Sequence, residues 1–205
     1  MLRHVSPPAR PPHILRGGSV AMSDTPTPPA GAPRVNVTLE EAGPEAVPVL
    51  RRLMQLYLYD LGTIDGWNIS TEGLYGNAEK IERFWTEPGR RAFFIRADAA
   101  LAGFALIRDQ AEHAGAGTWE ISEFFVLRKF RRQGVGARAA TQLLDLTPGP
   151  WEVTQLASNL PAQAFWRAVI GRYTSGDFTD VEEAHDQSGW PWRGRIQRFK
   201  ARRRP

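Results

Sequence analysis

The chain has 205 residues, of which 42% are hydrophobic and 23% are charged, and its formal net charge is +4. This length suits one domain with a proper core, and the composition is that of a soluble globular protein. A membrane-spanning role is excluded, because no apolar run approaches the roughly 20 residues that cross a bilayer. The absence of cysteine excludes disulfides, thiolate metal sites and a cysteine nucleophile. The four histidines lack ligand spacing, so no metal site is expected.

Basic residues gather in the N-terminal segment, at 128–138 and at the C-terminus. Such clusters can bind nucleic acid without sequence preference, although terminal basic residues are more often simply solvated. Nucleic-acid binding is therefore the weakest hypothesis for the function of this chain. Neither nucleic acid nor a membrane is an expected partner.

Residues 1–33 are rich in proline and show no hydrophobic periodicity, which predicts a disordered extension. The prolines leave no apolar core of signal-peptide length, and Met22 is an alternative start. We expect one domain over residues 34–200, a basic tail at 201–205 and a cytoplasmic protein.

The first ordered elements are a strand near residues 35–39, where apolar and polar residues alternate, and a helix. The helix has its apolar face at Leu50, Leu53, Met54, Tyr57 and Leu61, and we expect it to end at Gly62. A short helix with Ile81, Phe84 and Trp85 follows.

From Leu53 to Glu79, over the second half of the first helix and the loop after it, the chain is acidic and aromatic and has no lysine or arginine. Such a segment could recognise a cationic amine by charge and cation–π contact, while the alternative is a solvated loop with aromatic side chains in the core. The candidate acceptor-binding residues are Asp60, Asp65, Trp67, Glu72 and Tyr75.

Three strands come next, at residues 93–96, 101–107 and 119–127, and the first two form a hairpin through Asp98-Ala99-Ala100. A helix over 135–146, a strand over 151–156 and a helix from Pro161 to Gly171 follow. Closing strands are predicted at 173–181 and 194–199. This order predicts an α/β (α+β) fold with a mixed sheet.

The connection from Glu123 to Arg138 passes from a buried strand through basic residues and two glycines into a helix. Its helix start offers unpaired N–H groups, and glycine lets a phosphate approach the backbone closely. A P-loop and a dinucleotide fingerprint are both excluded, because the first motif is absent and Ala139 stands where a third glycine would.

The sequence Arg131-x-x-Gly134-x-Gly136 resembles the pyrophosphate-binding signature of the GNAT superfamily of acyl-CoA-dependent N-acyltransferases. A second motif, Asn159, Ala162, Phe165 and Trp166, and the order of elements extend the resemblance over about residues 34–180. The amino-acid sequence around both motifs is similar to that of a bacterial subgroup of predicted acetyltransferases. This similarity does not indicate a substrate.

The resemblance implies a mostly antiparallel sheet flanked by helices on both faces, with an acyl-CoA in a gap beside the third hairpin strand. The backbone at Phe125 and Val126 would bind the pantetheine arm, with Asn159 and Trp166 on the following helix. Arg128, Lys129 or Arg138 would meet the 3′-phosphate. The pyrophosphate would lie on the turn, whose implied binding residues are Arg131, Arg132, Gln133, Gly134, Val135 and Gly136.

Acetyl transfer to an amine requires a neutral nucleophile, so a protonated acceptor must lose a proton. Glu123 and Glu120 are the candidate bases, and in an unbulged strand they would point to opposite faces. Glu123 is preferred because it lies nearer the implied thioester. Many family members have a tyrosine acid where this chain has Trp166, so Tyr173 or another hydroxyl substitutes, or the thiolate leaves unassisted.

The expected function is transfer of an acetyl group from acetyl-CoA to a primary amine of a cationic acceptor. The alternative is a non-catalytic module that binds acyl-CoA and regulates or contacts a partner. The expected partners are acetyl-CoA and the amine acceptor, and a homodimer is left open.

Overall fold

The computed structural model describes residues 35–76, 81–187 and 190–202. Its seven strands form one sheet in the order β1-β2-β3-β4-β5-β7-β6. Every neighbouring pair is antiparallel except β4 and β5, which are parallel. The strands are β1 (Val37–Glu41), β2 (Arg90–Ala97), β3 (Ala100–Ala111), β4 (Gly115–Val126), β5 (Gly149–Leu156), β6 (Phe178–Gln187) and β7 (Trp190–Ala201).

The helices are α1 (Val47–Asp65), α2 (Arg83–Thr86), α3 (Val135–Leu146) and α4 (Leu160–Thr174), with short 3₁₀ turns η1 (Pro44–Ala46) and η3 (Arg128–Phe130). The predicted α/β fold with a mixed, mostly antiparallel sheet is confirmed. The order of elements also agrees with the prediction from the sequence. The expected extension over residues 1–33 and most of the expected basic tail lie outside the described residues.

The ends of two helices differ from the prediction. Gly62 does not end α1, which continues to Asp65 and stops where Gly66 adopts a left-handed conformation (φ 71°). Gly62 instead lets a ring pack closely, because a Cβ there would lie 2.9 Å from Cε1 of Tyr75. Its role is close packing on the buried face of the helix.

The end of the last helix was predicted at Gly171, and this too is wrong. α4 continues to Thr174 and ends at Ser175, whose φ is 58°. Tyr173 is therefore helical, and the closing strand predicted from residue 173 begins only at Phe178. The expected hairpin between β2 and β3 is present, and Asp98 and Ala99 both have positive φ, as a tight two-residue turn requires.

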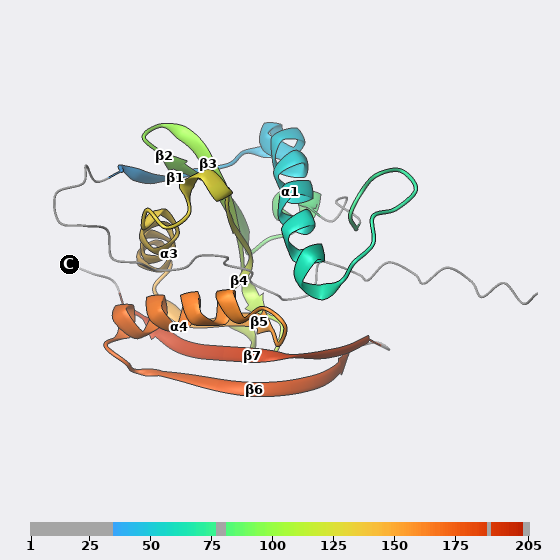
Figure 1. The fold of residues 1–205 in the computed structure, drawn as a ribbon. Coiled ribbons are helices and arrows are strands. Elements are labelled where there is room, and N and C mark those ends of the chain that lie inside the picture. The colour runs from blue at the N-terminus through green and yellow to red at the C-terminus, as the bar shows by residue number, and fades with distance from the viewer. Residues whose placement is uncertain (1–34, 77–80, 188–189, 203–205) are drawn as a thin grey trace, which may run out of the picture.

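Helices cover both faces of the sheet: α1 lies on one side, and α3 and α4 lie on the other (Figure 1). The α1 face has a core that includes Leu50, Met54, Phe104 and Phe125. The opposite core contains Phe124, Val135, Leu143, Phe165 and Trp166. Successive residues of β4 thus enter different cores, as the two-residue period of a strand demands.

β4 and β5 separate soon after they meet. They pair only at Trp119 with Trp151 and at Glu120 with Glu152. Beyond these pairs, residues 121–126 of β4 stay on β3, and residues 153–156 of β5 stay on β7. We call these two unpaired strand margins, 121–126 and 153–156, the splayed edges.

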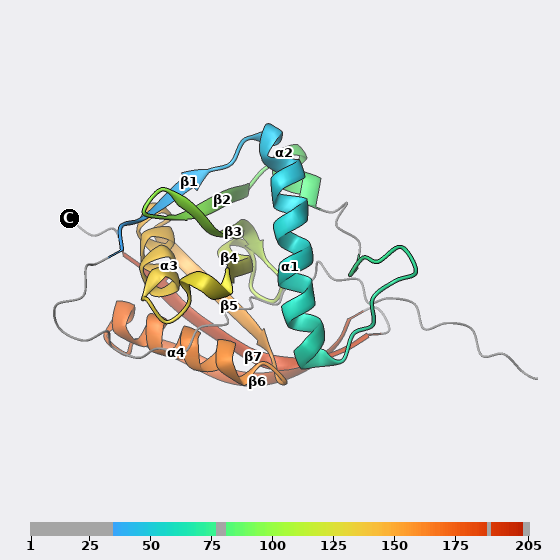
Figure 2. The same cartoon turned by 45° about the horizontal axis from the view of Figure 1, so that its top comes forward.

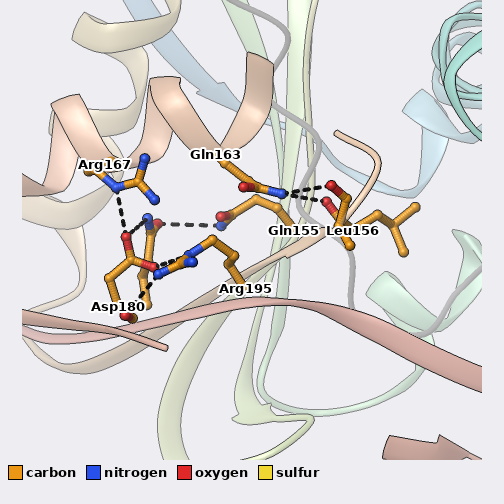
Figure 3. A network of polar contacts seen from close by, with 8 residues as sticks. Gln155, Leu156, Gln163, Arg167, Asp180 and Arg195 are labelled. Carbon is orange, nitrogen blue, oxygen red and sulfur yellow. Dashed lines mark hydrogen bonds and ion pairs between the residues drawn. The ribbon is translucent and has the colours of Figure 1, made fainter. Parts of the chain in front are cut away.

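A polar network ties α4 to the β5 side of the splayed edges (Figure 3). Gln163 donates to the carbonyls of Leu156 and Ala157 at 2.9 and 3.2 Å. Asp180 on β6 accepts from Arg167 of α4 at 2.8 Å and from Arg195 of β7 at 2.7 Å. These contacts fix α4 relative to β5, β6 and β7.

Within the described residues, none of the helices combines the length and hydropathy that a membrane crossing requires.

Candidate functional site

The turn between β4 and α3 contains a row of backbone donors without acceptors. Gly134 is the N-cap of α3 and has φ 73°, a conformation that glycine adopts without strain. In the described part of the chain, the N–H groups of Gln133, Gly134, Val135 and Gly136 donate to no acceptor. Free N–H groups at the positive end of a helix dipole form an anion site. This donor set would suit a pyrophosphate.

Arg131, the first residue of the motif, is used differently. Its N–H donates to the carbonyl of Arg128 at 3.2 Å, and its Nε donates to the carbonyl of Val126 at 2.7 Å. Its Nη2 lies 2.5 Å from Oδ2 of Asp60, and only 14% of its side chain is exposed. The side chain of Arg131 therefore holds the turn against β4 and α1.

Asp60 of α1 completes this arrangement. The carboxylate is buried, and its other oxygen, Oδ1, accepts from Nη2 of Arg128 at 2.6 Å. Asp60 was predicted to bind a cationic acceptor, but both of its oxygens contact arginines of the turn. Arg128 remains open to a further anion, because 67% of its side chain is exposed.

Gly136 lies where the start of α3 meets α4 and the end of β4. A Cβ at this position would lie 3.4 Å from Phe165 and 3.5 Å from Val126, which is ordinary contact distance. Packing alone therefore does not require a glycine here. The expected pantetheine contacts at Phe125 and Val126 lie on the splayed edge of β4, and their side chains are buried in the two cores.

The second motif caps α4. Oδ1 of Asn159 accepts from the N–H of Ala162 at 3.1 Å. The side chain is completely buried, yet its Nδ2 has no hydrogen-bond partner among the described residues. Ser122 Oγ on the splayed edge of β4 is also buried without a partner among the described residues. Buried polar groups normally have partners, so each of these two atoms is available to a polar ligand.

A β-bulge brings the two candidate bases to one face. Glu123 pairs with Leu106, but Ile121 pairs with Ile107, so Ser122 is an extra residue in β4. The expectation of opposite faces held only for an unbulged strand. With the bulge, Glu120 and Glu123 both lie on the face that α1 covers.

Glu123 is a buried carboxyl group with one strong partner. Its Oε2 accepts from the hydroxyl of Tyr57 on α1 at 2.5 Å, and the residue is 4% exposed. Burial raises the pKa of Glu123 to about 8, with a contribution from nearby Glu120, while the Tyr57 hydrogen bond acts in the opposite direction. A carboxyl group with this pKa can accept and release a proton near neutral pH.

Glu120 has a different environment. Its Oε2 accepts from Nη2 of Arg108 and from the N–H of Glu112, both at 2.7 Å, and the residue has no exposed surface. Burial raises the pKa of Glu120 to about 7 against the opposing charge of Arg108. The contacts bind Glu120 to the β3–β4 hairpin, which leaves Glu123 as the better candidate base.

Tyr173, the proposed substitute for the missing tyrosine acid, lies away from the expected donor site. Trp166 is completely buried and packs its ring against Phe124 at 5.2 Å. Tyr173 lies seven residues later on α4, about 10 Å along the helix axis. Its hydroxyl contacts Asp145 of α3 at 2.9 Å, away from the start of α4. The geometry thus separates Tyr173 from Asn159 and the splayed edges.

The remaining acceptor candidates lie at the end of α1 and in the segment that follows it. Asp65 accepts from Trp67 Nε1 at 2.8 Å and from Ser158 Oγ at 3.0 Å. This second contact joins the end of α1 to Ser158, the residue before the N-cap of α4, where α1 and α4 approach each other (Figure 2). Glu72 is exposed and accepts from Thr71, while Tyr75 contacts Tyr59 and the side chain of Gln55.

Among the described residues, His, Asp and Glu side chains form no group that could hold a metal ion.

Sequence comparison identifies one family. The model of the acetyltransferase (GNAT) family matches residues 57–171, a range that begins at the tyrosine contacting Glu123 and includes the turn, Asn159 and Trp166. No curated protein is significantly similar in sequence.

Solved structures share the fold at low sequence identity. An acetyltransferase from Thermus thermophilus superposes with a TM-score of 0.61 at 18% identity, covering 82% of this chain and 98% of that one. A GNAT-family acetyltransferase from Streptococcus agalactiae gives 0.61 at 15% identity, with 81% and 96% covered. Spermidine N-acetyltransferase from Vibrio cholerae, in complex with CoA and spermine, gives 0.52 at 12% identity, with 80% and 95% covered.

Proposed function

Because the chain belongs to the acetyltransferase (GNAT) family, we propose that it transfers the acetyl group of acetyl-CoA to a primary amine, with Glu123 as the general base. The observation that carries this proposal is the position of Glu123. Its carboxyl group lies on a splayed edge, beside the strand pair that separates, and the row of free N–H groups begins in the turn that follows the same strand. Donor binding and proton removal would thus meet on one strand.

The donor site would use the groups that lack partners. The N–H groups of Gln133 to Gly136 would bind the pyrophosphate, and Arg128 would add positive charge at the surface. Nδ2 of Asn159 would donate to the pantetheine arm between the splayed edges. Acetyl-CoA supplies the activated acyl carbon as a thioester.

Glu123 would start the reaction by taking a proton from the ammonium form of the acceptor. The neutral nitrogen then attacks the acyl carbon, the carbon–sulfur bond breaks, and an amide forms as the nitrogen loses its second proton, which the departing thiolate takes up to give free CoA. With a pKa of about 8, only about a tenth of Glu123 is charged at pH 7, so the rate should rise with pH. The thiolate can leave without an acid, because a thiol has a modest pKa of about 8.5.

The acceptor is proposed to be a cationic amine. Asp65 at the end of α1 and Glu72 in the segment after it are exposed carboxylates, and Trp67 Nε1 donates to Asp65. The Vibrio cholerae neighbour in complex with spermine is consistent with this class, although it shares only 12% identity. Asp60 is not part of this proposal, since its oxygens contact arginines.

The test is release of free thiol from acetyl-CoA with a panel of polyamines, diamines, amino acids and peptides. We expect turnover with a cationic amine, and Glu123→Gln should lower kcat by about 10² to 10⁴-fold without changing the affinity for CoA. Glu72→Gln is the matched control: it should raise KM for the amine and leave kcat nearly unchanged. Thiol release no faster than buffer hydrolysis with every amine would refute the proposal, and tight CoA binding in that case would favour a non-catalytic module.

A further inference from the structure

Glu123 receives a side-chain hydrogen bond from another element, the middle of α1. The hydroxyl of Tyr57 donates to Oε2 at 2.5 Å, although the two residues are 66 positions apart in the sequence. The other oxygen, Oε1, accepts no hydrogen bond from the described residues. It is also not one of the fully buried polar atoms that lack a partner, so it is not sealed off inside the core. One oxygen of Glu123 is thus occupied, and the other is left for a ligand.

The ring of Tyr57 has little freedom to move. It is 1% exposed and packs edge-on against Phe104 and Phe125, with ring centroids 5.9 and 5.7 Å away. Aromatic packing of this kind holds the ring in one orientation. The direction of the hydroxyl is therefore set by the core on the α1 face.

A second contact fixes α1 along β4. Asp60 lies three residues after Tyr57, on the same side of the helix, and it binds Arg128 and Arg131 beyond the end of β4. α1 is thus attached to β4 at the candidate base and at the anion-binding turn. These two attachments prevent the helix from sliding, so that the hydroxyl of Tyr57 stays opposite Glu123.

We propose that Tyr57 is a positioning residue, which occupies Oε2 of Glu123 and favours the charged carboxylate, so that Oε1 faces the acceptor and receives its proton. This inference rests on the proposed function of Glu123 and assigns the residue that controls it. Tyr57 transfers no proton in this scheme. The proton moves from the ammonium nitrogen to Oε1 while the hydrogen bond to Oε2 remains.

The other charged groups acting on Glu123 do not replace this contact. Glu120, on the same strand, disfavours the charged form, whereas Arg108 of β3 favours it weakly. Arg108 itself is bound to Glu120 and Glu112. Within the described residues, Tyr57 is thus the direct donor that opposes the effect of burial on Glu123.

The test is Tyr57→Phe, which removes the hydroxyl and keeps the ring. Because a hydrogen bond to a charged group favours the charged form, its loss should move the acid limb of the kcat/KM profile upward by about one to two pH units. At pH 7 the rate should fall by about 10 to 100-fold, and it should recover toward the wild-type value at high pH. KM for acetyl-CoA should not change.

Tyr59→Phe is the matched control, since Tyr59 lies on the same helix but is 53% exposed and contacts Tyr75. Its pH profile should match that of the wild type. A Tyr57→Phe variant that loses activity equally at every pH would overturn the inference, because a purely structural role lowers the rate without moving the limb.

A direct titration separates this inference from the proposed function. In protein labelled with ¹³C in the glutamate carboxyl groups, the signal that is missing in Glu123→Gln reports the pKa of Glu123. We expect a higher midpoint in Tyr57→Phe than in the wild type, and an unchanged or lower midpoint would refute the role of Tyr57. If the wild type acetylates no amine, the proposed function fails, and the two midpoints still decide whether Tyr57 controls Glu123.

Discussion

Asp60→Asn tests whether the link between α1 and the anion-binding turn supports the fold. The substitution keeps the size of the side chain and removes its charge. Asp60 is 3% exposed, and only 14% of the Arg131 side chain is exposed. In the variant, the charged group of Arg131 would stay mostly buried and would lose its charged partner. Removing one member of a buried ion pair costs about 3 to 5 kcal/mol. Arg128 can be hydrated, because 67% of its side chain is exposed, so the lower value of about 3 kcal/mol applies.

For a domain of this size, about 3 kcal/mol corresponds to a fall of roughly 6 to 12 °C in the melting temperature. The assay is thermal denaturation followed by circular dichroism, with and without CoA. CoA should stabilise the variant more than it stabilises the wild type, since its phosphates would replace the lost negative charge beside Arg128.

The matched control is Asp65→Asn, the same exchange on the same helix at an exposed position, which should change stability by no more than about 0.5 kcal/mol. If Asp60→Asn melted at the same temperature as Asp65→Asn, the two arginine contacts would contribute nothing to stability, and the account of α1 as the anchor of the turn would be wrong.

Two further predictions concern the base and the donor site. Burial raises the folded-state pKa of Glu123 from 4.5 to about 8, so the folded protein holds this proton more tightly and loses stability as the pH rises from about 5 to 8, by up to about 1.4 kcal/mol per pH unit. Denaturant unfolding at several pH values should show that the free energy of unfolding falls less steeply with pH in Glu123→Gln than in the wild type. In the exposed Glu45→Gln it should fall as in the wild type. Equal slopes in all three proteins would contradict the raised pKa assigned to Glu123. Gly134→Asp should abolish CoA binding in calorimetry, because it adds bulk and negative charge at the free N–H groups. Gly176→Asp, also at a positive φ but with open space around it, should bind CoA as the wild type does.

Much of the fold follows from local sequence patterns. Apolar residues at helical spacing predicted α1 and α3, and alternating or β-branched runs predicted the central strands. The turn between β4 and α3 was also predicted, because glycines and a helix start are features of a few adjacent residues. The limits of α1 and α4 were wrong: Gly62 serves close packing against Tyr75, and α4 continues past Gly171 to Thr174.

Local sequence patterns predicted less of the candidate site than of the fold. Glu123 was a candidate because of its place on the strand, yet its side chain shares a face with Glu120 only because Ser122 is bulged. A bulge is defined by pairing with β3, which local sequence does not specify. Tyr57 was assigned to the apolar face of α1 and to the aromatic residues of the acidic segment, and Asp60 was assigned to the acceptor.

The sequence by itself determined the family resemblance, the order of elements and the glycine-containing turn between β4 and α3, because each depends on residues close together in the chain. Only the tertiary structure decided the partners of the charged groups. Asp60 contacts arginines 68 and 71 positions away, and Tyr57 contacts a glutamate 66 positions away. These contacts form because α1 packs on the face of the sheet that includes Phe104 of β3 and Phe125 of β4, and that packing depends on the complementary shapes of two surfaces which come together only when the chain folds.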